Sequence, residues 1–170
     1  MKKFKLGFTL IELLIVIALL GALAVGLLAA LDPFEQLKKG TDTGVRNTVS
    51  EVHGAIIRYY AIKNYMPWCT GAGACGTEPA GIALTNAAMT TMITNIVGTG
   101  ELKSDFSTLA GTGTLGKIYV TGTDAAATVS VCYRPTAKSF LSDPNTKYNS
   151  SGVLTTCVTS DLATCFWCVK

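Results

Sequence analysis

Six cysteines account for most of the reactive side-chain chemistry in this sequence: Cys69, Cys75, Cys132, Cys157, Cys165 and Cys168. An even number of cysteines, all downstream of a long apolar segment, favours disulfides in an exported domain over reduced thiols. Cys69 and Cys75 enclose a short stretch rich in glycine and alanine, which favours a local bridge between them. The pairing of the other four stays open, because sequence alone does not determine connectivity.

The C-x-x-C motif at Cys165 and Cys168 has two other interpretations, a redox-active pair or half of a zinc site. A redox pair is disfavoured because no helix begins after the motif to lower a thiol pKa. A zinc ribbon needs two such knuckles, whereas Cys132 and Cys157 lie 25 residues apart. Structural disulfides are therefore preferred over both.

No other motif points to catalysis or to a bound cofactor. His53 is the only histidine, and the partners of a catalytic triad or a two-histidine metal site are missing around it. The glycine-rich residues 111–117 precede a predicted strand, whereas a phosphate-binding loop precedes a helix. Residues 141–152 contain Asp143 and Asn145 but a single carboxylate, which favours a surface turn over a calcium site. We expect no catalytic residue, no metal and no cofactor.

One acidic residue occurs where chemistry is least expected, in the apolar run of residues 8–31. These 24 residues would form a helix of about 36 Å, enough to cross a membrane, yet Glu12 lies near its start. Lys2, Lys3 and Lys5 precede the run and no basic residue follows until Lys38, so the short end should face the cytoplasm. A signal peptide cleaved after Ala24 would have an apolar core shorter than this run, and a plain anchor does not explain Glu12.

The residues around Glu12 closely resemble the processing and assembly signature of type IV pilins and pseudopilins. The sequence "KLGFTLIELLIVIALLGAL" matches that signature position by position from Gly7 to Glu12. The resemblance implies that a prepilin peptidase cuts between Gly7 and Phe8, and that Phe8 is then N-methylated. It also implies that Glu12 neutralises the N-terminal amine of a neighbouring subunit during filament assembly.

The physical chemistry agrees with this resemblance. An apolar setting penalises an isolated ammonium or carboxylate but strengthens their attraction once they are paired. Pairing would therefore favour one register between subunits. Gly7 has no side chain to keep a peptidase from the backbone. We predict that Phe8, Thr9 and Glu12 are assembly residues.

The elements that must position these residues begin with a long helix. Asp32 before Pro33 predicts a helix break, with Pro33 beginning a second segment. An apolar stripe at helical spacing then predicts the outer, amphipathic half of the helix, which ends before Pro67. The stripe consists of Val45, Val49, Val52, Ile56 and Tyr59.

The remaining residues predict a β-rich head. Residues 84–98 form an expected short helix, and the expected strands, arranged as an antiparallel meander, are 117–122, 127–134, 138–142, 152–158 and 164–169. The predicted fold is α+β: a long helical spine packed against an antiparallel sheet, the pilin lollipop. Its predicted parts are a leader (1–7), a transmembrane and assembly helix (8–31), the amphipathic half-helix (32–67) and the disulfide-bearing head (68–170).

Composition also excludes some functions. The chain is 49% hydrophobic and 15% charged, and its formal charge of +3 comes from the three leader lysines. Without them 11 basic residues face 11 acidic ones, so the basic surface of a nucleic-acid-binding protein is missing and no nucleic-acid partner is expected.

The expected function is that of a structural subunit rather than an enzyme. The subunit, expected to be a major one, would belong to a type IV pilus or to a type II secretion-like pseudopilus, two systems that the sequence does not separate. Its expected partners are itself, the prepilin peptidase and an inner-membrane assembly platform. It would begin as a single-pass membrane protein with its head outside the cytoplasm and end in a periplasmic or extracellular filament. The alternative is a monomeric, membrane-anchored or secreted binding domain.

Overall fold

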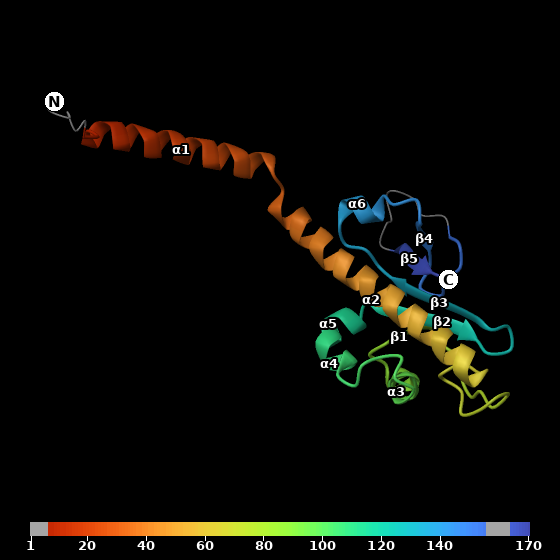
Figure 1. The fold of residues 1–170 in the computed structure, drawn as a ribbon. Coiled ribbons are helices and arrows are strands. Elements are labelled where there is room, and N and C mark those ends of the chain that lie inside the picture. Colours follow the sequence, from red (N-terminus) through yellow and green to blue (C-terminus); the bar gives the residue numbers. More distant parts are fainter. Residues whose placement is uncertain (1–6, 156–163) are drawn as a thin grey trace. The chain divides into compact units, whose positions relative to one another are not determined.

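The computed structural model describes residues 7–155 and 164–170. Contacts within the chain divide it into two compact units, with the boundary between Leu37 and Lys38. The first unit contains helix α1 (Leu10–Ala30) and the start of helix α2 (Pro33–Lys63). The second contains the rest of α2 and all the β-strands (Figure 1).

The helix is interrupted between α1 and α2. Leu31 has extended backbone angles (φ −101°, ψ 129°), and α2 begins at Pro33. Proline suits the first position of a helix because its missing N–H would have no intrahelical partner there. The Asp32 carboxylate accepts a hydrogen bond from the Glu35 backbone N–H at 3.2 Å, as an N-cap does.

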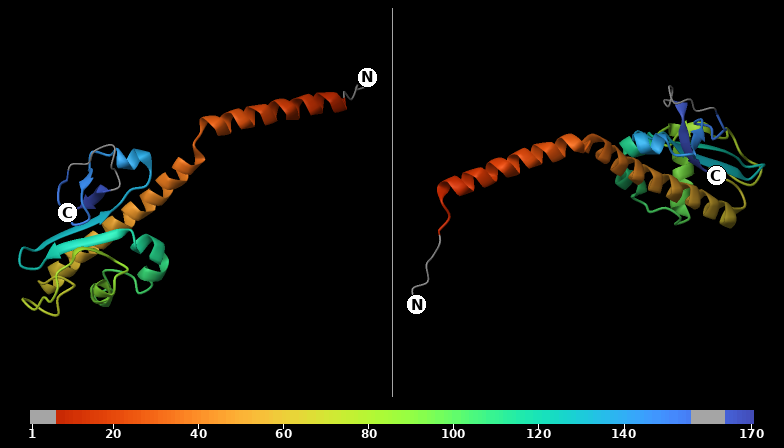
Figure 2. Two further views of the ribbon diagram at one scale, coloured as in Figure 1. Left: turned by 180° about the vertical axis from the view of Figure 1, so that it is seen from behind. Right: turned by 90° about the horizontal axis from the view of Figure 1, so that it is seen from above.

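Helix α2 contributes one face to the core of the second unit. The predicted stripe is confirmed, since Val45, Val49, Val52, Ile56 and Tyr59 are each at most 3% exposed. The helix stops at Asn64, whose φ of 59° lies in the left-handed region that asparagine tolerates at helix ends. Figure 2 shows the helix running along the sheet in two further views.

The sheet has five antiparallel strands in the order β1-β2-β3-β5-β4. Their bounds are β1 Ala80–Ala83, β2 Ile118–Thr123, β3 Thr128–Tyr133, β4 Thr146–Tyr148 and β5 Phe166–Val169. The expected antiparallel sheet is confirmed, but the strand order is not a simple meander. β5 lies between β3 and β4, so the end of the chain pairs with the middle of the sheet.

Alternation along the strands separates the two faces of the sheet. Ile118 and Val120 of β2 and Val131 and Tyr133 of β3 are completely buried in the core. Gly122 takes the next inward position of β2, where a Cβ would come within 2.5 Å of Trp68 Cη2 and 2.6 Å of Thr128 O. A glycine is therefore required for Trp68 to pack against this strand.

Short helices fill the segment between β1 and β2. A 3-10 turn η1 (Ala87–Met89) leads into α3 (Thr90–Gly98), where the sequence predicts a helix, and Met89, Met92 and Ile96 of this segment are buried. Two helices that the sequence does not predict follow, α4 (Phe106–Ala110) and α5 (Thr112–Leu115).

The prediction of a strand at 138–142 is wrong, because Lys138–Leu141 forms the short helix α6. The backbone turns there because the Asp42 carboxylate holds the N–H groups of Thr136 and Ala137 just before it. The prediction for 152–158 is met only by an isolated bridge between Leu154 and Tyr148, and residues 156–158 lie outside the described residues. Strands β1 and β4 were not predicted.

Two side chains of α2 connect the helix to the C-terminal part of the unit. Asp42 is 2% exposed and accepts hydrogen bonds from Thr136 N (2.8 Å), Thr136 Oγ1 (2.9 Å) and Ala137 N (2.7 Å). The Arg46 guanidinium lies 4.1 Å from the centroid of the Trp167 ring and 3.5 Å from the Asp143 carboxylate. These contacts join residues about 100 positions apart in sequence.

Candidate processing and assembly site

The predicted cleavage point lies in an exposed stretch of backbone ahead of α1. Gly7 and Phe8 have no regular secondary structure, and the Phe8 residue is 85% exposed. A Cβ added to Gly7 would meet no atom within 4 Å. Among the described residues, none packs closely against this peptide bond.

Thr9 and Glu12 form a capping box at the start of α1. The Glu12 Oε2 atom accepts hydrogen bonds from the Thr9 backbone N–H (2.9 Å) and from the Thr9 hydroxyl (2.7 Å). In return, the Glu12 backbone N–H donates to Thr9 Oγ1 at 3.4 Å. Reciprocal bonds of this kind satisfy two donors that a helix start would otherwise leave without partners.

The capping box explains how a carboxylate is held in an apolar helix. Glu12 lies in the first turn, where the helix dipole favours negative charge. Its carboxylate therefore has a fixed position and two donors of its own. Analysis of the sequence identified Thr9 only through the family signature. The spacing Thr-x-x-Glu ahead of an apolar run was a signal for this interaction.

Only one of the two Glu12 oxygens is used in the capping box. Within residues 7–155 and 164–170, Oε1 of Glu12 accepts no hydrogen bond. A carboxylate oxygen with free lone pairs is the natural acceptor for an ammonium group. The arrangement can therefore bind a cation without giving up the cap.

The rest of α1 is an apolar surface with nothing packed on it. Its 21 residues are apolar apart from Glu12, and none is buried within the chain. At about 1.5 Å per residue it is roughly 32 Å long, the thickness of a bilayer core. Among the described residues it is the one helix with the length and composition to cross a membrane.

The cysteines form disulfides. Cys69 is bonded to Cys75, and Cys132 on β3 is bonded to Cys168 on β5. Cys165 is also disulfide-bonded, while Cys157 lies outside the described residues. Because Cys168 is bonded to Cys132, the two sulfurs of the C-x-x-C motif do not form a bond with each other.

Other residues considered from the sequence belong to the second unit. His53 is half-buried on α2, and desolvation lowers its pKa. Asp143 binds Arg46 and accepts a hydrogen bond from the Asn145 backbone N–H at 2.8 Å. Both side chains thus belong to the folded part of the second unit.

Comparison with known proteins places these features in context. No curated protein and no solved structure matches the chain. One family model matches, described as the prokaryotic N-terminal methylation motif, over residues 2–28. The match covers Gly7, Phe8 and the capping box, and most of α1. The N-terminal segment of this protein thus carries the type IV pilin and pseudopilin signature, on a chain that combines an apolar helix with an antiparallel sheet.

Proposed function

We propose that this protein is a subunit of a type IV pilus or pseudopilus, expected to be a major one, that polymerises through α1. Cleavage between Gly7 and Phe8 would produce a new N-terminus, methylated on Phe8. The observation that carries the proposal is the Glu12 carboxylate, held at the N-terminus of an otherwise apolar helix with one oxygen unused.

The charges supply the assembly step. Cleavage creates an ammonium at Phe8, one residue ahead of the capping box. Within a membrane, this ammonium and the carboxylate of Glu12 are each costly alone, and they attract strongly when paired. Pairing the amine of one subunit with Glu12 of its neighbour would offset both costs in one register. The apolar surface of α1 would then pack against other copies of itself.

The same proposal assigns partners and a location. A prepilin peptidase would cut on the cytoplasmic side, where Lys2, Lys3 and Lys5 hold the leader. An inner-membrane assembly platform would move subunits from the bilayer into a periplasmic or extracellular filament. Disulfides in the second unit support its placement outside the cytoplasm.

Mass spectrometry of the protein purified from membranes tests the processing step. We expect loss of residues 1–7 and a methyl group on Phe8. An intact Met1, or an N-terminus created after Ala24, would contradict the proposal and favour a signal-peptide or anchor function.

Three variants test the role of Glu12, with filaments counted by electron microscopy. Glu12→Ala and Glu12→Gln should be processed normally yet form at least about tenfold fewer filaments, because neither provides a negative charge. Thr9→Val removes the capping hydroxyl but keeps the carboxylate, so it should reduce assembly less than Glu12→Gln. Glu51→Ala, at an exposed glutamate of α2, is the matched control and should assemble normally. Normal filaments from Glu12→Gln would refute the charge-pairing step.

A further inference from the structure

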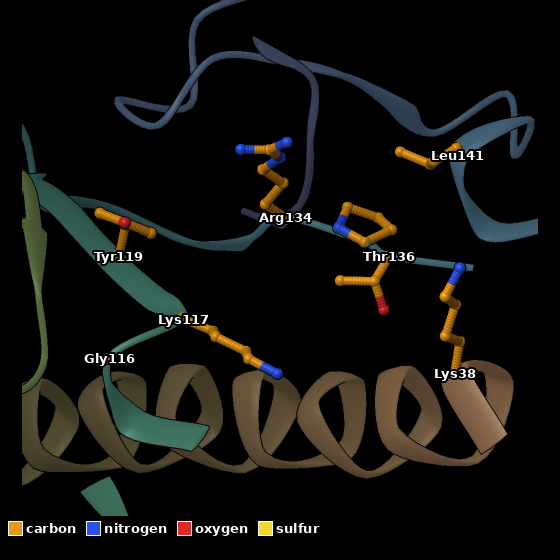
Figure 3. A pocket seen from close by; sticks show the side chains of 8 residues that line it. Lys38, Gly116, Lys117, Tyr119, Arg134, Thr136 and Leu141 are labelled. Carbon is orange, nitrogen blue, oxygen red and sulfur yellow. The ribbon is translucent and has the colours of Figure 1, made fainter. Parts of the chain in front are cut away.

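A basic cavity of about 540 Å³ lies in the second unit, where β2 begins and β3 ends (Figure 3). It is lined by Lys38, Gly116, Lys117, Tyr119, Arg134, Pro135, Thr136 and Leu141. Three of these side chains are cationic and none is a carboxylate. Lys38 rises from α2, while Lys117 and Arg134 come from the adjoining strand ends. We call this cavity the basic pocket.

Two of the cations come from facing positions at the end of the β2–β3 ladder. Ile118 pairs with Tyr133 at the end of the β2–β3 ladder, so the next positions along the two strands are Lys117 and Arg134. In Figure 3 their side chains point apart, Lys117 toward α2 and Arg134 away from it. Both side chains are exposed, and neither has an ion pair within the described part of the chain. The positive charges of Lys117 and Arg134 are thus left for a bound anion to neutralise.

The buried acid Asp42 does not neutralise the pocket. Asp42 lies behind Thr136, and its two oxygens accept the three hydrogen bonds from Thr136 and Ala137. Even with that charge counted, Lys117 and Arg134 together leave a surplus of positive charge. Tyr119, Pro135 and Leu141 add a partly apolar wall, which suits an anionic group carried on an organic molecule better than a bare ion.

The length of the chain limits how far Lys38 can lie from the end of α1. Lys38 follows Ala30, the last residue of α1, by eight positions, a reach of at most about 28 Å. Of the two acids in between, Asp32 caps α2 and Glu35 has a partner of its own. If α1 spans a bilayer, Lys38 at the rim of the pocket is therefore tethered within that distance of one membrane surface. Basic residues close to a membrane attract anionic lipids by about 1 kcal/mol each.

We propose that the basic pocket binds the phosphate of an anionic lipid headgroup while the subunit waits in the membrane. Lys117 and Arg134 are the main phosphate-binding residues, with Lys38 at the rim. This inference rests on the proposed function in one respect, that α1 spans the bilayer. Binding would hold the second unit at the membrane surface until assembly withdraws the subunit.

Native mass spectrometry of the full protein, purified from membranes in detergent, tests the proposal. The measurement is the retention of phosphatidylglycerol relative to phosphatidylcholine. We expect the Lys117→Gln/Arg134→Gln variant to lose this preference by at least about tenfold, given about 1 kcal/mol for each cation. The matched control is Lys63→Gln/Lys103→Gln, which removes the same charge from exposed positions outside the pocket. It should retain lipid as the unaltered protein does.

A second measurement separates a lipid headgroup from free phosphate. Thermal unfolding is followed with inorganic phosphate and with phosphatidylglycerol in mixed micelles. The lipid should stabilise the unaltered protein, and not the pocket variant, at concentrations where phosphate has little effect. Equal stabilisation by free phosphate, or equal lipid retention by the pocket and control variants, would overturn the proposal. A pocket variant that keeps its lipid but no longer forms filaments would also overturn the proposal, because this result would mean that the pocket contacts another subunit.

The two proposals fail separately. Processed subunits that polymerise without any lipid preference would sink the inference alone. An unprocessed N-terminus in a protein whose pocket still selects phosphatidylglycerol would sink the proposed function and leave the lipid site supported.

Discussion

At the scale of single residues, Asp42 has the most demanding environment in the second unit. Its carboxylate is 2% exposed and depends on the three hydrogen bonds from Thr136 and Ala137. A buried charge is tolerated only when its hydrogen bonds are complete. Nearby, burial and then the charge of Asp42 raise the pKa of Tyr133, so its hydroxyl stays neutral in the folded protein.

We expect Asp42→Ala to lower the free energy of unfolding by about 3 kcal/mol, because two backbone N–H groups lose their acceptor. Asp42→Asn keeps one acceptor oxygen and should cost less. Urea denaturation of the protein in detergent measures both changes. Asp105→Ala, at an exposed aspartate, should change stability by less than about 0.5 kcal/mol. An Asp42→Ala variant as stable as this control would show that the contacts to residues 136 and 137 are dispensable.

At the scale of elements, α2 has two distinct faces. Ile56 is completely buried against the sheet, whereas the next residue, Ile57, is 43% exposed. Successive helix positions are rotated by about 100°, so adjacent residues of the same type can differ completely in burial. The two isoleucines thus differ in environment and not in chemistry.

Ile56→Ala should therefore destabilise the second unit by roughly 3 kcal/mol, through lost burial and the cavity left behind. Ile57→Ala is its matched control and should cost less than about 1 kcal/mol. Urea denaturation of the two variants under the same conditions gives the comparison. Similar losses for both would mean that the exposed side of α2 is also covered in solution.

At the scale of the whole molecule, disulfides connect distant parts of the second unit. The Cys132–Cys168 bond spans 36 positions and joins paired strands β3 and β5, whereas Cys69–Cys75 spans six. In the chain-entropy model, a longer closed loop restricts the unfolded chain more. The bond between β3 and β5 should therefore contribute more to stability.

Replacing both cysteines by serine tests this comparison. Cys132→Ser/Cys168→Ser should lower the free energy of unfolding by about 4 kcal/mol, against about 2 kcal/mol for Cys69→Ser/Cys75→Ser. Urea denaturation without reductant measures the difference, which should shrink when reductant is added to all three proteins. A larger loss from the 69/75 pair would contradict the loop-length argument.

The sequence predicted those features whose information is local. The apolar stripe of α2 could be predicted because helical spacing recurs every three or four residues. The N-terminal signature could be recognised because six consecutive positions carry it. The capping box was equally local, in the spacing of Thr9 and Glu12, although it was recognised only in the structure. The strand predicted at 138–142 failed because a contact from Asp42, far away in sequence, determines that backbone.

What the sequence by itself determined is the N-terminal assembly signature, the apolar helix and the class of fold, since each depends on residue types at short spacings. Only the tertiary structure decided that Cys168 bonds with Cys132, that β5 lies between β3 and β4, and that Lys117 and Arg134 line one pocket. These are pairings between segments separated by many residues. Loop-closure costs vary slowly with chain length, so many pairings are nearly equivalent in the unfolded chain, and core packing selects among them.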